Sequence, residues 1–70
     1  MKYEELVPLL VDRRKRSHTM DEMAKLTGLT RQSLSYFENL KSVSYKILLR
    51  YLCILCTQDE LGDIITNLEI

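Results

Sequence analysis

Four polar side chains on one predicted helix have the chemistry to contact DNA bases. At 100° per residue, Arg31, Gln32, Ser35 and Tyr36 project to one side of a helix expected over residues 31–38. Arginine can donate two hydrogen bonds to guanine O6 and N7, and glutamine can pair with adenine N6 and N7. Tyr36 can pack on a thymine methyl group or reach a phosphate. We predict these four residues as base contacts; the alternative is an ordinary polar helix surface.

A second set of residues would hold the DNA backbone and so position the base contacts. Such contacts come from basic side chains, from hydroxyl groups and from the free N–H groups at a helix start. The predicted set is Arg13, Arg14 and Arg16 on the first helix, Thr30 and Ser33 near the base contacts, and Lys41, Ser42, Ser44 and Lys46 at the start of the fourth helix. The alternative for the basic run is a helix C-terminus, where cations meet the negative end of the dipole.

Two short helices and a tight turn would position the predicted base contacts. Thr19 and Glu22 form a capping box that starts the first of these helices, and Gly28 suits the left-handed residue that ends it. Thr30 is an N-cap candidate for the second helix. The residues that would allow close packing and anchor the second helix from beneath are Ala24, Leu29, Leu34 and Phe37. This pattern predicts a helix-turn-helix.

The chain as a whole is predicted to be all-α, with five short helices and one domain over residues 1–70. The expected helices cover residues 4–15, 20–27, 31–38, 44–56 and 57–69. The fourth is apolar nearly all round, so we expect it to be buried on most sides. The fifth begins with a capping box of Thr57 and Glu60 and carries an apolar stripe. We expect the last two helices to contribute core and a dimer interface.

The formal net charge of zero conceals a strong segregation of charge along the chain. Residues 1–12 carry a net −2, residues 13–50 carry nine bases and three acids for a net +6, and residues 51–70 carry a net −4. The basic segment contains the whole predicted helix-turn-helix. The neutral total therefore does not exclude a nucleic acid as the partner. We expect the acidic end to turn away from DNA.

The segment MDEMAKLTGLTRQSLSYFENLK, residues 20–41, resembles the Cro and phage-repressor-like helix-turn-helix proteins, the XRE family. It has the family's helix alanine, turn glycine, T-x-Q-S start of the recognition helix and closing E-N-x-K. The resemblance implies a compact five-helix, lambda-repressor-like domain in which Arg13 pairs with Glu38. The chain departs from the family at Leu40, where glycine is common, and at Met20, which cannot support Arg31 as a glutamine would.

The resemblance further implies a transcriptional regulator, most simply a homodimeric autorepressor on a palindromic operator. Half-sites would lie about 10 base pairs apart. We predict a dimer face of Ile64, Ile65, Leu68 and Ile70, with Leu61 turned inward. Stand-alone family members of this size include phage Cro-like proteins, restriction–modification controllers and anti-CRISPR-associated autorepressors. An antitoxin-type module that binds a protein and its own promoter is the alternative function.

Other chemistry finds little support in the sequence. Cys53 and Cys56 are interpreted as buried, reduced thiols of a cytoplasmic protein, and His18 as a loop residue, so we expect no metal and no cofactor. Ser/His/Asp sets, paired carboxylates in a cleft and phosphate loops are not recognisable, so we do not expect an enzyme. The apolar runs are too short to cross a membrane. A small-molecule ligand is not indicated either.

Overall fold

The computed structural model describes residues 1–68, which form five helices and no strand. The helices are α1 (Tyr3–Ser17), α2 (Met20–Thr27), α3 (Arg31–Glu38), α4 (Tyr45–Leu55) and α5 (Gln58–Asn67). This result confirms the prediction of an all-α fold. Among the described residues, no helix has the length and apolar character needed to span a bilayer.

Threonine caps define where three of the helices begin, as the sequence predicts. The hydroxyl oxygens of Thr19 and Thr57 accept hydrogen bonds from backbone N–H groups three residues later, and both residues start capping boxes. Thr30 caps α3 in the same way. Gly28 ends α2 with φ 72°, in the left-handed region that glycine occupies without steric cost. These caps fix the three-residue connection between α2 and α3.

The hydrophobic core lies between the first four helices. Its buried residues are Tyr3, Leu6, Val7 and Leu10 on α1, Met23 on α2, Leu34 and Phe37 on α3, and Ile47, Leu48, Tyr51 and Leu52 on α4. Edge-to-face aromatic contacts join Tyr3 to Phe37, with 6.2 Å between ring centroids, and Phe37 to Tyr51, with 4.8 Å between ring centroids. These contacts tie α3 to both α1 and α4, and they set which side of α3 faces outward.

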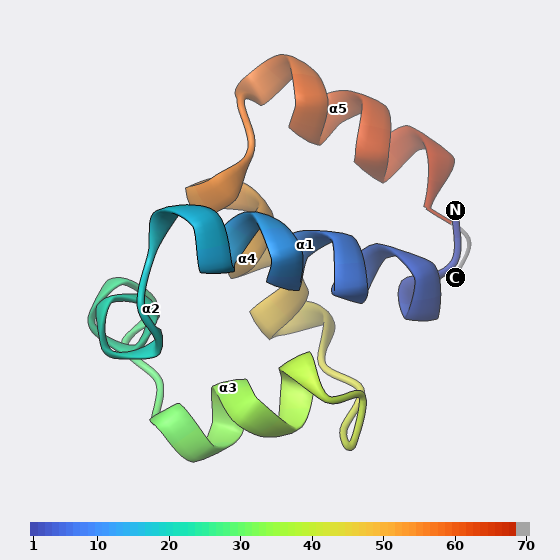
Figure 1. The fold of residues 1–70 in the computed structure, drawn as a ribbon. Helices are drawn as coiled ribbons and strands as arrows, with labels where there is room; N and C mark the ends of the chain where they lie inside the picture. Colours follow the sequence, from blue (N-terminus) through green and yellow to red (C-terminus); the bar gives the residue numbers. More distant parts are fainter. Residues whose placement is uncertain (69–70) are drawn as a thin grey trace.

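α4 crosses the middle of the fold, and α3 and α5 lie on opposite sides of the α1–α4 pair (Figure 1). The expectation that α4 is buried on most sides is only partly correct. Leu49 and Cys53 are exposed, as are the basic residues Lys46 and Arg50. These four positions recur every three or four residues, so they form one outer face of the helix.

α5 packs on the core through part of its apolar stripe. Leu61, Ile64 and Leu68 are partly buried against the core, whereas Ile65 is 49% exposed. Of the predicted dimer face, Ile65 is exposed, and Ile64 and Leu68 are only partly accessible to a partner. Ile70 lies outside the described part of the chain.

Candidate nucleic-acid interface

The outward side of α3 presents the predicted base contacts. Leu34 and Phe37 are fully buried beneath the helix, and Arg31, Gln32 and Tyr36 are exposed on its other side. Ser35 is partly buried. Arg31, Gln32 and Ser35 line a shallow surface hollow together with Met20 of α2. Helix α3 thus exposes hydrogen-bonding groups on one side while its other side is anchored in the core.

Two side-chain contacts organise this face. Gln32 Nε2 donates a hydrogen bond to the Tyr36 hydroxyl at 3.1 Å, across one turn of α3. Arg31 Nε lies 3.2 Å from Oδ1 of Asp21, which belongs to the first turn of α2. Sequence reasoning did not identify Asp21. The sequence feature that could have indicated this pair is an acidic residue in the first turn of one helix together with a basic residue at the start of the next.

The buried ion pair beneath α3 involves Arg14, so the predicted Arg13–Glu38 pair is wrong by one residue. Arg14 donates to the Glu38 carboxylate from Nε at 3.0 Å and from Nη2 at 2.7 Å. The Tyr51 hydroxyl also donates to this carboxylate, at 2.6 Å. The hydrogen bond with Glu38 raises the pKa of Arg14, and burial, followed by the contact with Glu38, raises the pKa of Tyr51. This network fastens the end of α3 to α1 and α4.

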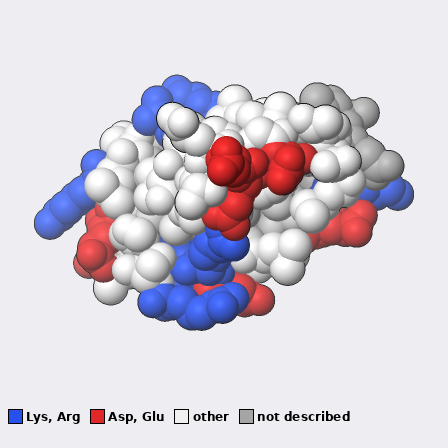
Figure 2. All heavy atoms as spheres, turned by 90° about the horizontal axis from the view of Figure 1, so that it is seen from above, with Lys and Arg blue, Asp and Glu red and all other residues white. Residues whose placement is uncertain are grey.

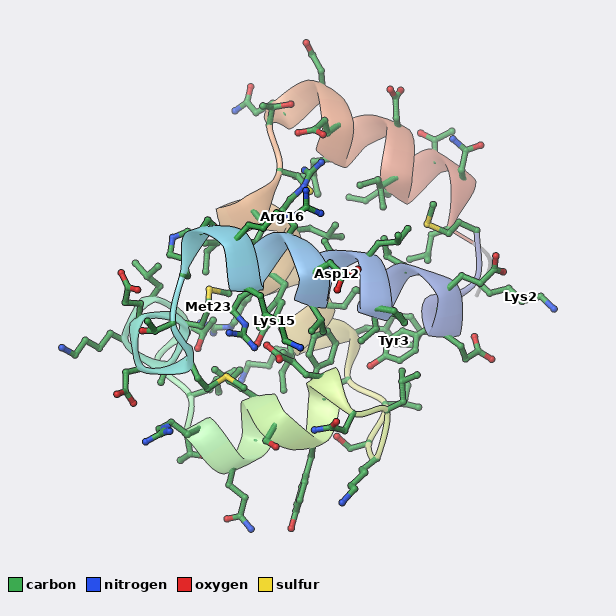
Figure 3. The ribbon with its side chains drawn as sticks, in the orientation of Figure 1. Lys2, Tyr3, Asp12, Lys15, Arg16 and Met23 are labelled. Atoms are coloured by element: carbon green, nitrogen blue, oxygen red, sulfur yellow. The ribbon has the colours of Figure 1, made fainter. Side chains whose placement is uncertain are left out.

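The basic residues of α1 do not form the phosphate-binding row that the sequence suggested. Arg14 is buried in the pair with Glu38 and cannot reach a phosphate. Arg13 turns toward α5, where Nη2 lies 3.0 Å from Oε2 of Glu60, and this contact lowers the pKa of Glu60. Figure 3 shows Arg16 on the α5 side of α1, and Lys15 on the α3 side. Lys15, which sequence reasoning did not single out, is the exposed base of this run on the α3 side, whereas Arg14 is buried against Glu38.

Three of the predicted backbone-contact hydroxyls already serve the fold. Thr30 accepts from the Ser33 backbone N–H at 3.1 Å and donates to the Ser33 hydroxyl at 2.9 Å. Ser44 caps α4 by accepting from the Ile47 N–H at 3.2 Å. In contrast, Lys41, Ser42 and Lys46 are exposed. These last three side chains, in the loop after α3 and the first turn of α4, remain candidates for contact with a phosphate backbone.

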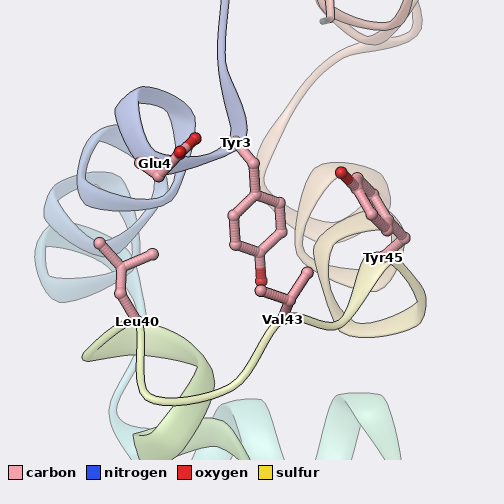
Figure 4. Close-up of a pocket in the computed structure, with 5 residues that line it drawn as sticks. All are labelled: Tyr3, Glu4, Leu40, Val43 and Tyr45. Carbon is pink, nitrogen blue, oxygen red and sulfur yellow. The ribbon is translucent and has the colours of Figure 1, made fainter. Parts of the chain in front are cut away.

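The α3–α4 loop turns at Leu40, which adopts a conformation usually left to glycine. Its φ is +57°, and the N–H groups of Leu40 and Lys41 donate to the carbonyls of Phe37 and Tyr36 at 3.1 and 2.9 Å. This is the Schellman pattern of a helix end. The Leu40 side chain lies over a hollow that it lines with Tyr3, Glu4, Val43 and Tyr45 (Figure 4). The backbone therefore keeps the turn that glycine would give, despite the leucine.

Charge is distributed unevenly over the two ends of the fold. α5 carries Asp59, Glu60 and Asp63 and no basic residue. Seen from the α5 side, acidic side chains gather in the middle of the face (Figure 2). Because α3 lies on the opposite side of α1 and α4 (Figure 1), this acidic surface is turned away from the candidate interface.

The cysteines differ from the expectation of two buried thiols. Cys53 is exposed on α4, and Cys56 is partly buried beside Arg13. Burial raises the pKa of the Cys56 thiol. Within residues 1–68, no three His, Cys, Asp or Glu side chains are grouped so that they could hold a metal ion.

Comparison of the chain with protein-family models, with curated proteins and with solved structures yields no match. The case for a function therefore depends on the residues and geometry described above.

Proposed function

We propose that the protein is a sequence-specific double-stranded DNA-binding regulator of transcription, most simply a homodimeric autorepressor. In this proposal α2 and α3 act as a helix-turn-helix, and α3 enters the major groove. The observation that carries the proposal is the exposed row of Arg31, Gln32 and Tyr36 on a helix whose other side is fully buried. The alternative is an ordinary polar surface helix. Such a helix needs only polar residues on its exposed side, and not side chains that can each donate or accept hydrogen bonds with bases.

The surroundings of α3 support this orientation. Lys41 and Lys46 follow α3 and are exposed, and Lys15 lies on the α3 side of α1 (Figure 3). These bases suit contacts with phosphates on either side of the groove. The acids of α5 lie on the far side of the fold, where they do not repel DNA. Because the net charge is zero, binding to random DNA should be weak, and discrimination should depend on α3.

Selection of bound duplexes from a random pool tests the proposal directly. We expect an enriched palindrome with half-site centres about 10 base pairs apart. Arg31→Ala should cost about 1–3 kcal/mol of binding free energy and relax one base position. Lys46→Ala should weaken binding to all sequences alike and reduce the salt slope by about one unit. Lys2, an exposed base at the start of α1 (Figure 3), provides the matched control, and Lys2→Ala should leave binding unchanged. A pool that yields no enriched sequence would contradict the proposal.

Exposed apolar residues on α5 and between α2 and α4 are available to a second copy of the chain. Ile65 is exposed on α5, and Leu26 and Leu49 flank a shallow groove between α2 and α4. We propose dimerisation through α5, as the sequence suggested. Sedimentation of Ile65→Glu and Leu49→Glu separates the two faces, because only the first should give a monomer.

An antitoxin-type protein would use α3 in the same way on its promoter, and co-purification of a partner with the native chain would favour it.

A further inference from the structure

The ion pair between Asp21 and Arg31 links the starts of the two helices of the candidate interface. Asp21 is the second residue of α2, and Arg31 is the first residue of α3. Their side chains are 67% and 69% exposed, with 3.2 Å between Oδ1 and Nε. A pair this exposed contributes little to folding stability, because water screens it. Its placement at the outward face needs a different explanation.

The position of Arg31 is electrostatically unfavourable without a partner. The N-terminus of a helix carries the positive end of the dipole, so a cation at the first residue of α3 is repelled. A carboxylate is favoured at the start of α2, where Asp21 lies. Asp21 therefore supplies the negative charge that offsets the cost at Arg31. It also restricts a long side chain that would otherwise sample many rotamers.

The geometry of the pair determines which donors of Arg31 remain available. Nε lies 3.2 Å from Oδ1 of Asp21, in an ionic contact without hydrogen-bond geometry, and Nη1 and Nη2 donate no hydrogen bond among the described residues. These two nitrogens form the end of the guanidinium fork, and guanine offers two matching acceptors, O6 and N7, in the major groove. A carboxylate beside the fork repels phosphate, so it also disfavours use of Arg31 as a simple backbone contact.

From these contacts we propose that Asp21 is a positioning residue that directs Arg31 to a guanine in the operator half-site. This inference rests on the proposed DNA-binding function and adds the base that the site reads. Asp21 itself touches no base in this account. Its effect is to turn a flexible cation into a selective reader at one position.

Base preference in the Asp21→Asn variant tests the proposal. The operator comes from the random-pool selection, and the position read by Arg31 is the one whose preference Arg31→Ala removes. There, wild type should prefer guanine by roughly 5- to 150-fold. Asp21→Asn should reduce this preference about twofold to fivefold, which corresponds to the interaction energy of an exposed ion pair. It should also steepen the salt slope on random DNA by up to about one unit, because Arg31 becomes free to contact phosphates.

Two controls separate positioning from simple charge. Asp63→Asn removes the same charge from α5, on the far side of the fold, and should leave the preference unchanged. In the Arg31→Ala background, Asp21→Asn should have no effect on base preference, because the positioned group is gone. Circular dichroism of each variant verifies that the fold is intact.

The outcomes are distinct. An unchanged preference in Asp21→Asn, or an equal gain in affinity for all sequences in both backgrounds, overturns the positioning role. A preference for a base other than guanine at the position read by Arg31 overturns the assignment of the base. If wild type selects no sequence and Arg31→Ala changes nothing, the proposed function itself fails, and that result is recognisable before Asp21 is tested.

Discussion

Replacing Arg14 with methionine should destabilise the fold far more than the same replacement of Arg13. Both arginines form an ion pair with a glutamate, but the burial of the pairs differs. The Arg14–Glu38 side chains are 11% and 6% exposed, and the Arg13–Glu60 side chains are 44% and 43% exposed. Methionine keeps an unbranched apolar stem and removes the guanidinium at both positions, so the comparison tests how burial changes the effect of losing that group.

The expected magnitudes follow from the two environments. Arg14→Met leaves the Glu38 carboxylate buried with only the Tyr51 hydroxyl as a partner, and breaking such a pair costs about 3–5 kcal/mol. Arg13→Met removes an exposed pair worth about 0–1 kcal/mol. For a domain of this size, each kcal/mol lowers Tm by roughly 4–8 °C. Thermal unfolding followed by circular dichroism should therefore show a fall of at least about 12 °C for Arg14→Met and less than about 8 °C for Arg13→Met.

A combined variant tests the reason for the loss. Arg14→Met, Glu38→Leu and Tyr51→Phe together remove the guanidinium, the carboxylate and the hydroxyl, so no buried charge is left without a partner. Replacing a whole buried pair with apolar residues is often neutral, and the combined variant should recover most of the lost stability. Equal losses for Arg13→Met and Arg14→Met would refute the assignment of the buried pair. A combined variant with a lower Tm than Arg14→Met would refute the explanation that an unpaired buried charge causes the loss.

Three further predictions concern the loop, the thiols and one cap. Leu40→Gly should have a free energy of unfolding about 1 kcal/mol higher than Leu40→Ala in urea unfolding, because both variants lose the side chain but only glycine relieves the positive φ. If alanine is instead the more stable of the two, as is usual within helices, the positive φ at Leu40 is wrong. Cys53 should react with a thiol reagent faster than Cys56, whose raised pKa and burial disfavour the thiolate; equal rates in single Cys→Ser variants would disprove this. The hydrogen bond from the Thr19 N–H lowers the pKa of Glu22 from its ordinary value. The Glu22 carboxylate therefore stabilises the fold fully above that ordinary value, and this stabilisation is lost as pH falls through the lowered pKa. The free energy of unfolding measured across this acidic range should fall less steeply for Glu22→Gln than for wild type.

The helices and their caps could be predicted from the sequence because these signals are local. Thr19, Thr30 and Thr57 each cap a helix through groups only three residues away, and Gly28 meets a requirement of its own backbone. The period of the apolar residues likewise predicts that Leu34 and Phe37 face inward. Such features depend on the chain immediately around them, so a single sequence contains the information.

The contacts between helices could not be predicted with the same accuracy. Adjacent residues differ by 100° around α1, so an error of one residue in the assigned inward face exchanges Arg13 for Arg14 as the partner of Glu38. The outer face of α4 could have been found from Lys46 and Arg50, which share it with Leu49 and Cys53. The pair of Asp21 with Arg31 depends on how α2 and α3 cross, and the sequence does not specify that geometry.

The lack of any buried side chain on α5 has a consequence for the dynamics of the protein. Among the described residues, the buried apolar side chains all lie on the first four helices, and α5 adds only partly buried side chains at the edge of that core. Segments that bury little surface undergo local unfolding at a lower free energy than the rest of a domain. The backbone amides of α5 should thus exchange hydrogen with solvent while those of α1 and α4 stay protected. A partner bound at Ile65 would slow this exchange, so association and the order of α5 would be thermodynamically linked.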